Sequence, residues 1–263
     1  MRLRLSCLAV CALAAATASS PAAVAAKPGA KQHRFPWHKR VQDATRFLST
    51  RTGTASFAVV DERGRIHGHR RGVQYSSASL VKAMLLVAYL DRGEVRRRDL
   101  RGRERHLLGP MVRLSDNDAA SAIYERVGVD GLNRLAHRAG MRQFAANPVW
   151  GGCQVTARDQ ARFFLRVRAL LPKRHRKYAV SLLRRIVSYE RWGIPPATPA
   201  GWIPYFKGGW FQDDDGWRVH QGALLRDGNR RIAIAVLTDG SPTLEYGAAT
   251  ITGVTSRLLR SYR

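Results

Sequence analysis

"YSSASLVKAMLLVAYL", residues 75–90, places Lys82 inside an almost unbroken apolar run. A helix that is apolar on nearly every face is expected to be buried. Burying an unpaired ammonium group is costly unless the group loses its proton or finds partners. Lys82 is therefore either an accident of packing or a group whose chemistry depends on its burial.

Ser79 lies three residues before Lys82, so the two side chains share one face of a helix that begins near residue 78. Ser79 then lies at the helix N-terminus, where free N–H groups favour a developing negative charge. To act as a general base, Lys82 needs its pKa lowered from about 10.4 toward about 7. The alternative is a capping serine beside a snorkelling lysine, because the S-x-x-K spacing alone often arises by chance.

A second polar cluster, Ser115-Asp116-Asn117, stands at the entry to another predicted helix. The serine hydroxyl could shuttle a proton, and the asparagine amide could hold a substrate carbonyl. The structural alternative is a capping box formed by Ser115 and Asp118.

The third cluster is Lys207-Gly208-Gly209, on the first of three predicted C-terminal strands. Glycines weaken a strand, so two in succession indicate that something approaches the backbone closely, and a substrate lying along the strand would do so. A glycine kink or bulge is the structural alternative.

The remaining pattern predicts a helix over residues 37–51, a β-hairpin over 55–69 and mostly helical chain from 76 to about 190, with Gly128 among the helix stops. Three strands follow over 203–210, 217–225 and 230–240, and a helix over 244–261 closes the chain. Strands at both chain ends predict one antiparallel sheet, with the middle helices as a subdomain beside it.

Taken together and in this order, the three clusters resemble the penicillin-recognising serine enzymes, the class A beta-lactamase and penicillin-binding-protein family. The resemblance covers roughly residues 40–262. It implies an α/β fold of the beta-lactamase/transpeptidase type, in which an antiparallel sheet of about five strands is flanked by helices and a helical subdomain. It also implies that Lys82 is buried because its neutral amine is the working form.

The resemblance implies acyl transfer with catalytic Ser79, Lys82, Ser115 and Lys207. Ser79 would attack an amide carbonyl while Lys82 takes its proton, and the oxyanion would lie between the backbone N–H groups of Ser79 and Trp210. Ser115 and Lys207 would relay a proton to the departing nitrogen.

The substrate-binding residues that the resemblance implies are Asn117, which would hold a substrate side-chain amide, the strand residues Gly208, Gly209 and Trp210, and Arg218. Either Lys207 or Arg218 would meet the substrate carboxylate. The resemblance calls for no cofactor and no metal. His67 and His69 are most simply polar positions on a surface strand.

The sequence departs from the family at two functional positions. Gly208 stands where the family has a hydroxyl residue, so one hydrogen bond to a substrate carboxylate is lost. The segment "GMRQFAANPVWGGCQVT", residues 140–156, contains no Asp or Glu, although class A beta-lactamases carry their deacylating glutamate on the corresponding loop. Asp159 and Glu190 are the nearest acidic candidates. The spacing from Ser79 to Ser115 is also short, which predicts a trimmed helical subdomain.

The N-terminus predicts export. Residues 1–26 combine arginines, an Ala-rich apolar run and small residues, as a secretory signal peptide does. The run is short for a membrane anchor, and Cys11 lacks the setting of a lipoprotein. Residues 27–36 read as a disordered basic tail, and 37–263 as one serine hydrolase domain. The mature chain would keep Cys153 alone, as a small buried residue.

The formal net charge is +26, with 45 Lys and Arg against 19 Asp and Glu. No nucleic-acid-binding motif accompanies this charge, so we expect no nucleic-acid partner. For an exported protein the charge favours contact with anionic wall polymer or a membrane surface. The expected substrate is a beta-lactam or a peptidoglycan-derived peptide, and we expect a monomer.

Three functions are consistent with these residues. The first is a secreted acyl hydrolase or transferase that deacylates slowly. The second is an esterase that uses the same serine and lysine on small esters. The third is a wall-binding protein on a decayed enzyme scaffold, which the intact reactive set disfavours.

Overall fold

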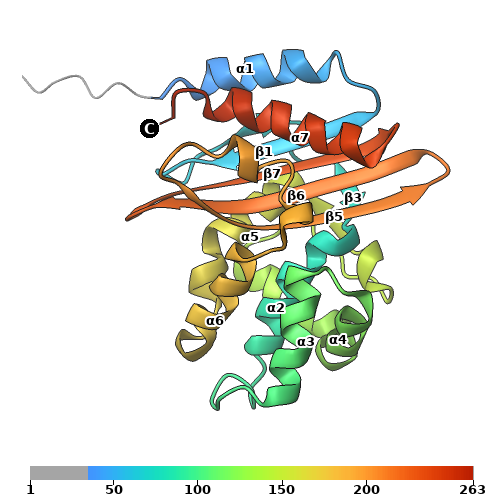
Figure 1. Ribbon diagram of the computed structural model, residues 1–263, viewed down its shortest axis with the longest axis vertical. Coiled ribbons are helices and arrows are strands. Elements are labelled where there is room, and N and C mark those ends of the chain that lie inside the picture. Colours follow the sequence, from blue (N-terminus) through green and yellow to red (C-terminus); the bar gives the residue numbers. More distant parts are fainter. Residues whose placement is uncertain (1–34, 263) are drawn as a thin grey trace, which may run out of the picture. The chain divides into compact units, whose positions relative to one another are not determined.

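A computed structural model describes residues 35–262 of the chain (Figure 1). The predicted signal peptide and most of the predicted basic tail lie outside the described residues. Phe35 and Pro36, the last two residues of that tail, are described. The ring of Phe35 packs against Trp37 and Tyr262, with both centroid distances at 4.6 Å. The folded region therefore includes Phe35, two residues before the predicted domain boundary.

The main sheet has five strands in the order β2-β1-β7-β6-β5, and every neighbouring pair is antiparallel. Two strands come from the N-terminal part and three from the C-terminal part, as predicted. The bounds are β1 Thr54–Val60, β2 Ile66–His69, β5 Ile203–Asp213, β6 Gly216–Asp227 and β7 Arg230–Ser241. A second, small sheet pairs β3 (Gln74–Ser76) with β4 (Gln154–Thr156).

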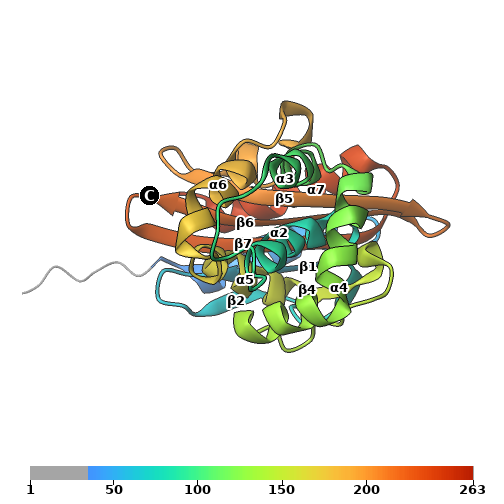
Figure 2. The ribbon, with the colours of Figure 1, turned by 90° about the horizontal axis from the view of Figure 1, so that it is seen from below.

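Helices cover both faces of the main sheet (Figures 1 and 2). The helices α1 (Trp37–Leu48) and α7 (Leu244–Leu259) lie on one face. The other face carries the helical subdomain, in which α5 packs directly on β1, β6 and β7. Its members are α2 (Lys82–Leu90), α3 (Gly102–Arg113), α4 (Asn117–Ala139), α5 (Ala157–Leu170) and α6 (Lys173–Arg184). The α/β architecture is thus the predicted one.

Short 3₁₀ turns connect these elements: η1 (Ala78–Val81), η2 (Trp150–Gly152), η3 (Ser188–Glu190) and η4 (Pro195–Ala197). The predicted helix stop at Gly128 is a break inside α4, where this glycine has φ 64° and ψ 177°. A positive φ of this size suits glycine because it has no Cβ. None of the described helices is both long enough and apolar enough to cross a membrane.

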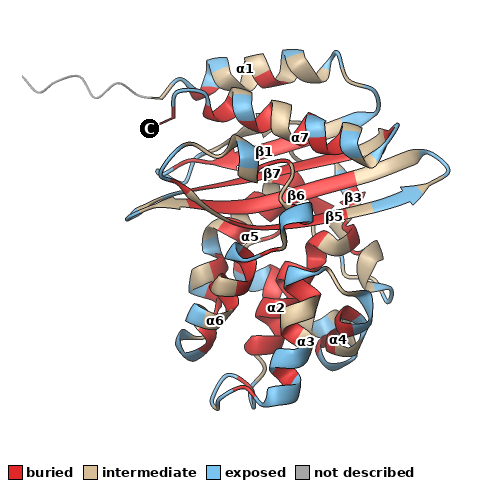
Figure 3. Ribbon diagram, viewed as in Figure 1, coloured by how far each residue is buried: buried red, intermediate tan, exposed pale blue. Residues whose placement is uncertain are grey.

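The sheet separates two apolar cores (Figure 3). Strand β7 contributes side chains to both cores, because alternate residues of a strand point to opposite faces of the sheet. Ala233, Ala235 and Leu237 pack toward the helical subdomain. Ile232, Ile234 and Val236 pack toward α1 and α7. All nine residues of α2 are buried, so this part of the apolar run over residues 75–90 lies inside the subdomain core.

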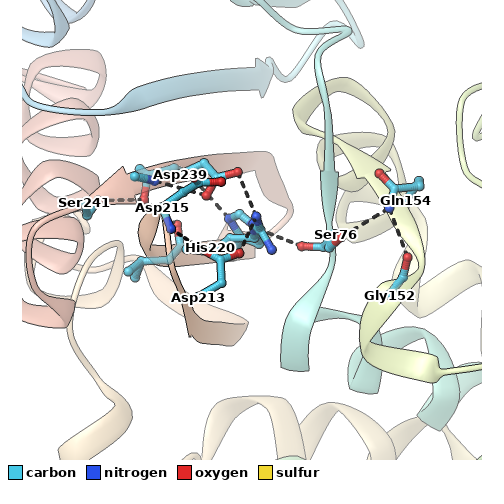
Figure 4. Close-up of polar contacts among 12 residues, drawn as sticks. Ser76, Gly152, Gln154, Asp213, Asp215, His220, Asp239 and Ser241 are labelled. Atoms are coloured by element: carbon cyan, nitrogen blue, oxygen red, sulfur yellow. Dashed lines mark hydrogen bonds and ion pairs between the residues drawn. The ribbon is translucent and has the colours of Figure 1, made fainter.

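His220 on β6 connects the main sheet to the small one (Figure 4). Its Nδ1 accepts from the backbone N–H of Thr238 at 3.3 Å, so Nε2 carries the proton and donates to the carbonyl oxygen of Ser76 at 3.0 Å. Gln154 donates to the hydroxyl of Ser76 from β4 at 3.2 Å. These bonds fix the strand that leads into Ser79.

His220 makes stability sensitive to acid. Burial lowers the pKa of His220 from its ordinary 6.5 to about 4. The unfolded chain therefore binds the proton first, and folding stability is lost as the pH falls from about 6.5 through about 4. We expect the free energy of unfolding to fall by roughly 3 kcal/mol more in the wild type than in His220→Gln over this range. Urea titrations at several pH values measure it, and equal acid sensitivity of the two proteins would contradict the assignment.

Candidate active site

Ser79 lies in the 3₁₀ turn η1, between strand β3 and helix α2. The predicted helix start is therefore a tighter turn, and the α-helix begins at Lys82. Ala78, just before the serine, has φ 46°, which is strained for a residue with a Cβ. The strained turn leaves Ser79 partly exposed, while Leu80 and Val81 beside it are fully buried.

Lys82 is fully buried, and its Nζ contacts two carbonyl oxygens. The backbone oxygen of Ser115 lies 2.5 Å from Nζ and Oδ1 of Asn117 lies 2.7 Å from it. A neutral amine has two N–H donors and one lone pair. Both donors are therefore occupied, and the lone pair remains free to accept a proton.

Electrostatics favour this neutral form. Burial, and then the positive charge of Lys207, lower the pKa of Lys82 to about 7, against weaker opposing effects of Glu190 and Asp116. The sequence predicted this shift as the requirement for a lysine base. Near neutral pH a large fraction of Lys82 is therefore able to act as a base.

Ser115 joins the two lysines. Its hydroxyl oxygen lies 3.0 Å from Nζ of Lys207 and 3.5 Å from Nζ of Lys82. Its φ of 54° is unusual for a serine and belongs to the turn that precedes α4. That turn is capped by Asp116, which accepts from the N–H of Ala119 at 2.7 Å, so the capping role predicted for Ser115 belongs to its neighbour. The Ser115 hydroxyl is thereby available to carry a proton between lysines.

Lys207 has three hydrogen-bond partners, one for each proton of its ammonium group. They are the Ser115 hydroxyl at 3.0 Å, the Glu190 carboxylate at 3.1 Å and the backbone oxygen of Gly208 at 2.9 Å. Lys207 and Glu190 are both buried. Burial lowers the pKa of Lys207 and Glu190 counteracts that effect, so the carboxylate favours a positive charge here.

At Gly209, strand β5 packs closely against η1, the turn that carries Ser79. A Cβ at this position would lie 2.4 Å from the backbone nitrogen of Leu80 and 2.9 Å from that of Ser79. The close approach that the two glycines predicted is therefore made by the protein's own backbone at Gly209. It brings the strand segment that leads into Trp210 beside the N–H of Ser79, as a pair of oxyanion donors requires.

Gly208 faces an indole ring. A Cβ there would lie 3.1 Å and 3.2 Å from two ring atoms of Trp192. The Trp192 ring packs edge-on against Trp210, with a centroid distance of 5.9 Å. Aromatic surface thus covers the position where the family would have a hydroxyl side chain.

Arg218 lies on β6, with Nη2 3.0 Å from a carboxylate oxygen of Asp213 and 3.0 Å from one of Asp239. A substrate carboxylate would have to compete with both acids. The binding role proposed for Arg218 remains a prediction, and this pairing disfavours it.

The acid-free loop places Trp150 over Lys82. The Lys82 Nζ lies 4.7 Å from the centroid of the Trp150 ring. Asp159 is buried and accepts from the backbone N–H of Gln143 at 2.7 Å, so it anchors the start of this loop. The other candidate, Glu190, is bonded to Lys207. Neither acid is bonded to Ser79 or Lys82 in the described chain.

Sequence reasoning did not find three features of the site: the Lys207–Glu190 pair, the Trp150 lid over Lys82 and the Trp192 cover on Gly208. Two of the residues involved, Glu190 and Trp192, lie in the segment "YERWG", residues 189–193, between the last helix of the subdomain and β5. His67 is bonded to Asp61 at 2.8 Å and stacks on Trp37, as a polar surface position can. Residues 35–262 contain no cluster of three or more His, Cys, Asp or Glu suited to a metal ion.

Comparison with known proteins identifies relatives of this architecture. A profile described as the beta-lactamase enzyme family matches residues 98–262, more than half of the chain. The matched region includes Ser115, Asn117 and Lys207 and begins after Ser79 and Lys82. No curated protein sequence matches the chain.

Several solved structures share the fold. A class A beta-lactamase from Mycobacterium abscessus is 20% identical with a TM-score of 0.71, covering 85% of this chain and 99% of its own. A beta-lactamase from Sphaerobacter thermophilus is 19% identical with a TM-score of 0.71, covering 86% and 97%. A protein named PBP-A is 19% identical with a TM-score of 0.70, covering 85% and 95%.

The two neighbouring glycines of β5 should respond differently to an added methyl group. Gly209→Ala would press on the backbone nitrogens of Ser79 and Leu80 and displace the predicted oxyanion donors, so we expect Ser79 to react about 100-fold more slowly with a fluorophosphonate. Gly208→Ala, the matched control, meets only a side-chain ring that can shift, and should stay within about tenfold of the wild type. Labelling rates, with thermal unfolding as a check on folding, measure the difference. Equal rates for the two variants would contradict this oxyanion site.

Proposed function

Because the chain belongs to the beta-lactamase enzyme family, a family of serine hydrolases, we propose that it is a secreted acyl hydrolase or transferase acylated at Ser79. The substrate that we propose is a beta-lactam or a cell-wall peptide amide. The observation that carries the proposal is the state of Lys82, which is fully buried, has a pKa lowered to about 7 and lies one turn from a partly exposed serine.

In the acylation step the Ser79 oxygen attacks the amide carbon while the lone pair of Lys82 accepts the serine proton. The backbone N–H groups of Ser79 and Trp210 stabilise the negative charge on the carbonyl oxygen. The C–N bond then breaks, and the Ser115 hydroxyl donates a proton to the departing nitrogen. Ser115 recovers a proton from the neighbouring lysines, so Lys82 returns to its neutral form.

Asn117 supports substrate binding in this scheme. Its Oδ1 accepts from Lys82 at 2.7 Å. Its Nδ2 group has no partner among residues 35–262 and is free to donate to a substrate carbonyl. One side chain would thus hold the base and orient the acyl group.

Deacylation is proposed to be slow. A water that attacks the acyl-enzyme needs a base, and general-base catalysis typically contributes about 10² to 10⁴ in rate. The loop that could carry such a base carries Trp150 over Lys82 instead, and Glu190 is bonded to Lys207. Acylation, in this proposal, requires only Ser79 and its lysine, Lys82.

The proposal also includes a location outside the cytoplasm and an anionic partner surface. The leader over residues 1–26 supports a location outside the cytoplasm. A pocket between α1 and α7 is lined by five cationic side chains and one acid, which supports contact with an anionic wall polymer or membrane surface. The cationic residues are Lys39, Arg40, Arg46, Arg257 and Arg260.

The proposal predicts a trapped intermediate. The chromogenic beta-lactam nitrocefin should give a stoichiometric burst followed by slow turnover, with an adduct that lasts minutes in intact-protein mass spectra. Peptide mapping should place the adduct on Ser79, and Ser79→Ala should abolish it. A label that survives in Ser79→Ala would reject the nucleophile, and fast turnover without an adduct would reject slow deacylation. Absence of both adduct and turnover would favour an esterase or a binding scaffold.

Glu190→Gln distinguishes two roles of this acid. If Glu190 holds Lys207, the variant removes the countercharge of a buried ammonium, and we expect acylation to slow about tenfold or more. If Glu190 instead activates the deacylating water, acylation should persist and the adduct should last longer. Rates of adduct formation and loss by mass spectrometry separate these outcomes. Glu245→Gln, at an exposed position in the first turn of α7, is the control for charge removal alone.

A further inference from the structure

Among the described residues, the two that the resemblance assigns to a carboxylate on the leaving-group side, Gly208 and Lys207, are not free to bind one. Gly208 provides no hydroxyl, and the three protons of Lys207 are bonded to Ser115, Glu190 and the Gly208 carbonyl. The charge of Lys207 is also balanced by Glu190. Binding a substrate carboxylate here would require breaking a buried ion pair.

The adjoining hairpin is acidic rather than basic. Asp213, Asp214 and Asp215 form its tip, and Asp239 lies on the next strand. Arg218, bonded to Asp213 and Asp239, is the cation of this group. Asp213 and Asp239 both pair with the Arg218 guanidinium, so this cation is already balanced and is not free to attract an anionic leaving group, although the chain as a whole has a net charge of +26.

Aromatic surface occupies the same side of the site. Trp192 covers the Gly208 position, and the ring of Trp210 lies 5.9 Å from both the Trp192 centroid and the Lys207 Nζ. Both indoles are partly exposed. Trp210 lies beside Lys207, and Trp192 lies beside Trp210 and Gly208, so both rings adjoin the lysine that, in the proposed mechanism, supplies the leaving-group proton through Ser115.

Two exposed apolar side chains lie next to site residues in the sequence. Tyr189, 69% exposed, precedes Glu190, and Phe211, 53% exposed, follows Trp210. The other exposed large hydrophobic residues in the described part of the chain, Leu114 and Val149, also lie beside site residues, namely Ser115 and Trp150. Exposed apolar surface beside a polar reacting centre is typical of a binding site.

We propose that the leaving-group subsite formed by Trp192 and Trp210 favours acyl compounds whose leaving group is apolar and uncharged, above all neutral esters, so that beta-lactams and cell-wall peptides, which carry a carboxylate on that side, acylate Ser79 more slowly than neutral esters do. This inference rests on the proposed role of Ser79. The serine oxygen bonds to the ester carbon as Lys82 takes the serine proton. The C–O bond breaks, and the alcohol leaves with a proton from Ser115. Water then cleaves the acyl-serine bond, which releases the acid and restores Ser79.

A matched pair of esters tests the subsite. The probes are the phenyl ester of an N-acylated glycine and the same ester with a carboxylate at the meta position of the leaving phenol. We expect kcat/KM for the neutral ester to exceed that for the charged ester by about tenfold or more. A charged ester that reacts equally fast or faster would overturn the inference. The rate with Ser79→Ala is subtracted as background.

A tryptophan pair provides the matched variants. Trp192 and Trp217 are both partly buried against the same core, but only the ring of Trp192 covers Gly208. Trp192→Ala should lower the neutral-to-charged ratio about tenfold, whereas Trp217→Ala should leave it unchanged. The ratio is insensitive to the fraction of active protein, so a loss of stability alone does not move it. An unchanged ratio in Trp192→Ala would overturn the inference.

The experiment also separates this inference from the proposed function. Ser79-dependent turnover that favours the charged ester rejects the subsite and keeps the nucleophile. Absence of Ser79-dependent turnover with both esters, together with absence of an adduct on Ser79, rejects both. If Trp192→Ala does not fold, the ratio measured for the wild type decides.

Discussion

The site depends on two buried lysine amines that lie beside one serine hydroxyl. Lys82 and Lys207 both lie near the Ser115 hydroxyl, and two neighbouring positive charges away from water are strongly unfavourable. Of these two lysines, Lys207 is the one bonded to the carboxylate of Glu190 in the described chain. The positive charge is therefore assigned to Lys207 and the neutral amine to Lys82. The position of Glu190 therefore accounts for the different protonation states assigned to the two lysines.

The fold brings these groups together from distant segments and holds them with strained backbone. Ser79 and Lys82 come from η1 and α2, Ser115 from the turn before α4, and Lys207 from strand β5. Ala78, next to the proposed nucleophile Ser79, and Ser115, the proposed proton relay, both have positive φ. Such strain persists only where the surroundings enforce it. The two cores on either side of the sheet and the His220 bond to β3 provide that support.

The features of the fold and the site that depend on local sequence pattern could be predicted. The five-stranded sheet followed from alternating strands at both chain ends, and the buried amine of Lys82 followed from an ammonium group in an apolar helix. The pairing of Glu190 with Lys207 could not be predicted, because it joins a short turn to a strand 17 residues away. The rings of Trp150 and Trp192 cover the site from loops whose paths depend on tertiary packing. Gly209 was recognised as a point of close approach, but the approaching group is the turn that carries Ser79, which only the folded chain reveals.

The Lys207–Glu190 pair has a consequence for how the molecule meets its surroundings. With Lys82 only partly protonated near neutral pH and Lys207 paired with Glu190, the reacting centre carries little net charge, although the chain as a whole is at +26. Long-range attraction therefore draws the protein toward anionic surfaces without guiding small molecules into the cleft. Dissolved salt screens interactions between exposed charges over about 8 Å at physiological ionic strength and affects buried pairs far less. Where the protein resides should thus vary with ionic strength, while its chemistry at Ser79 should be nearly indifferent to it.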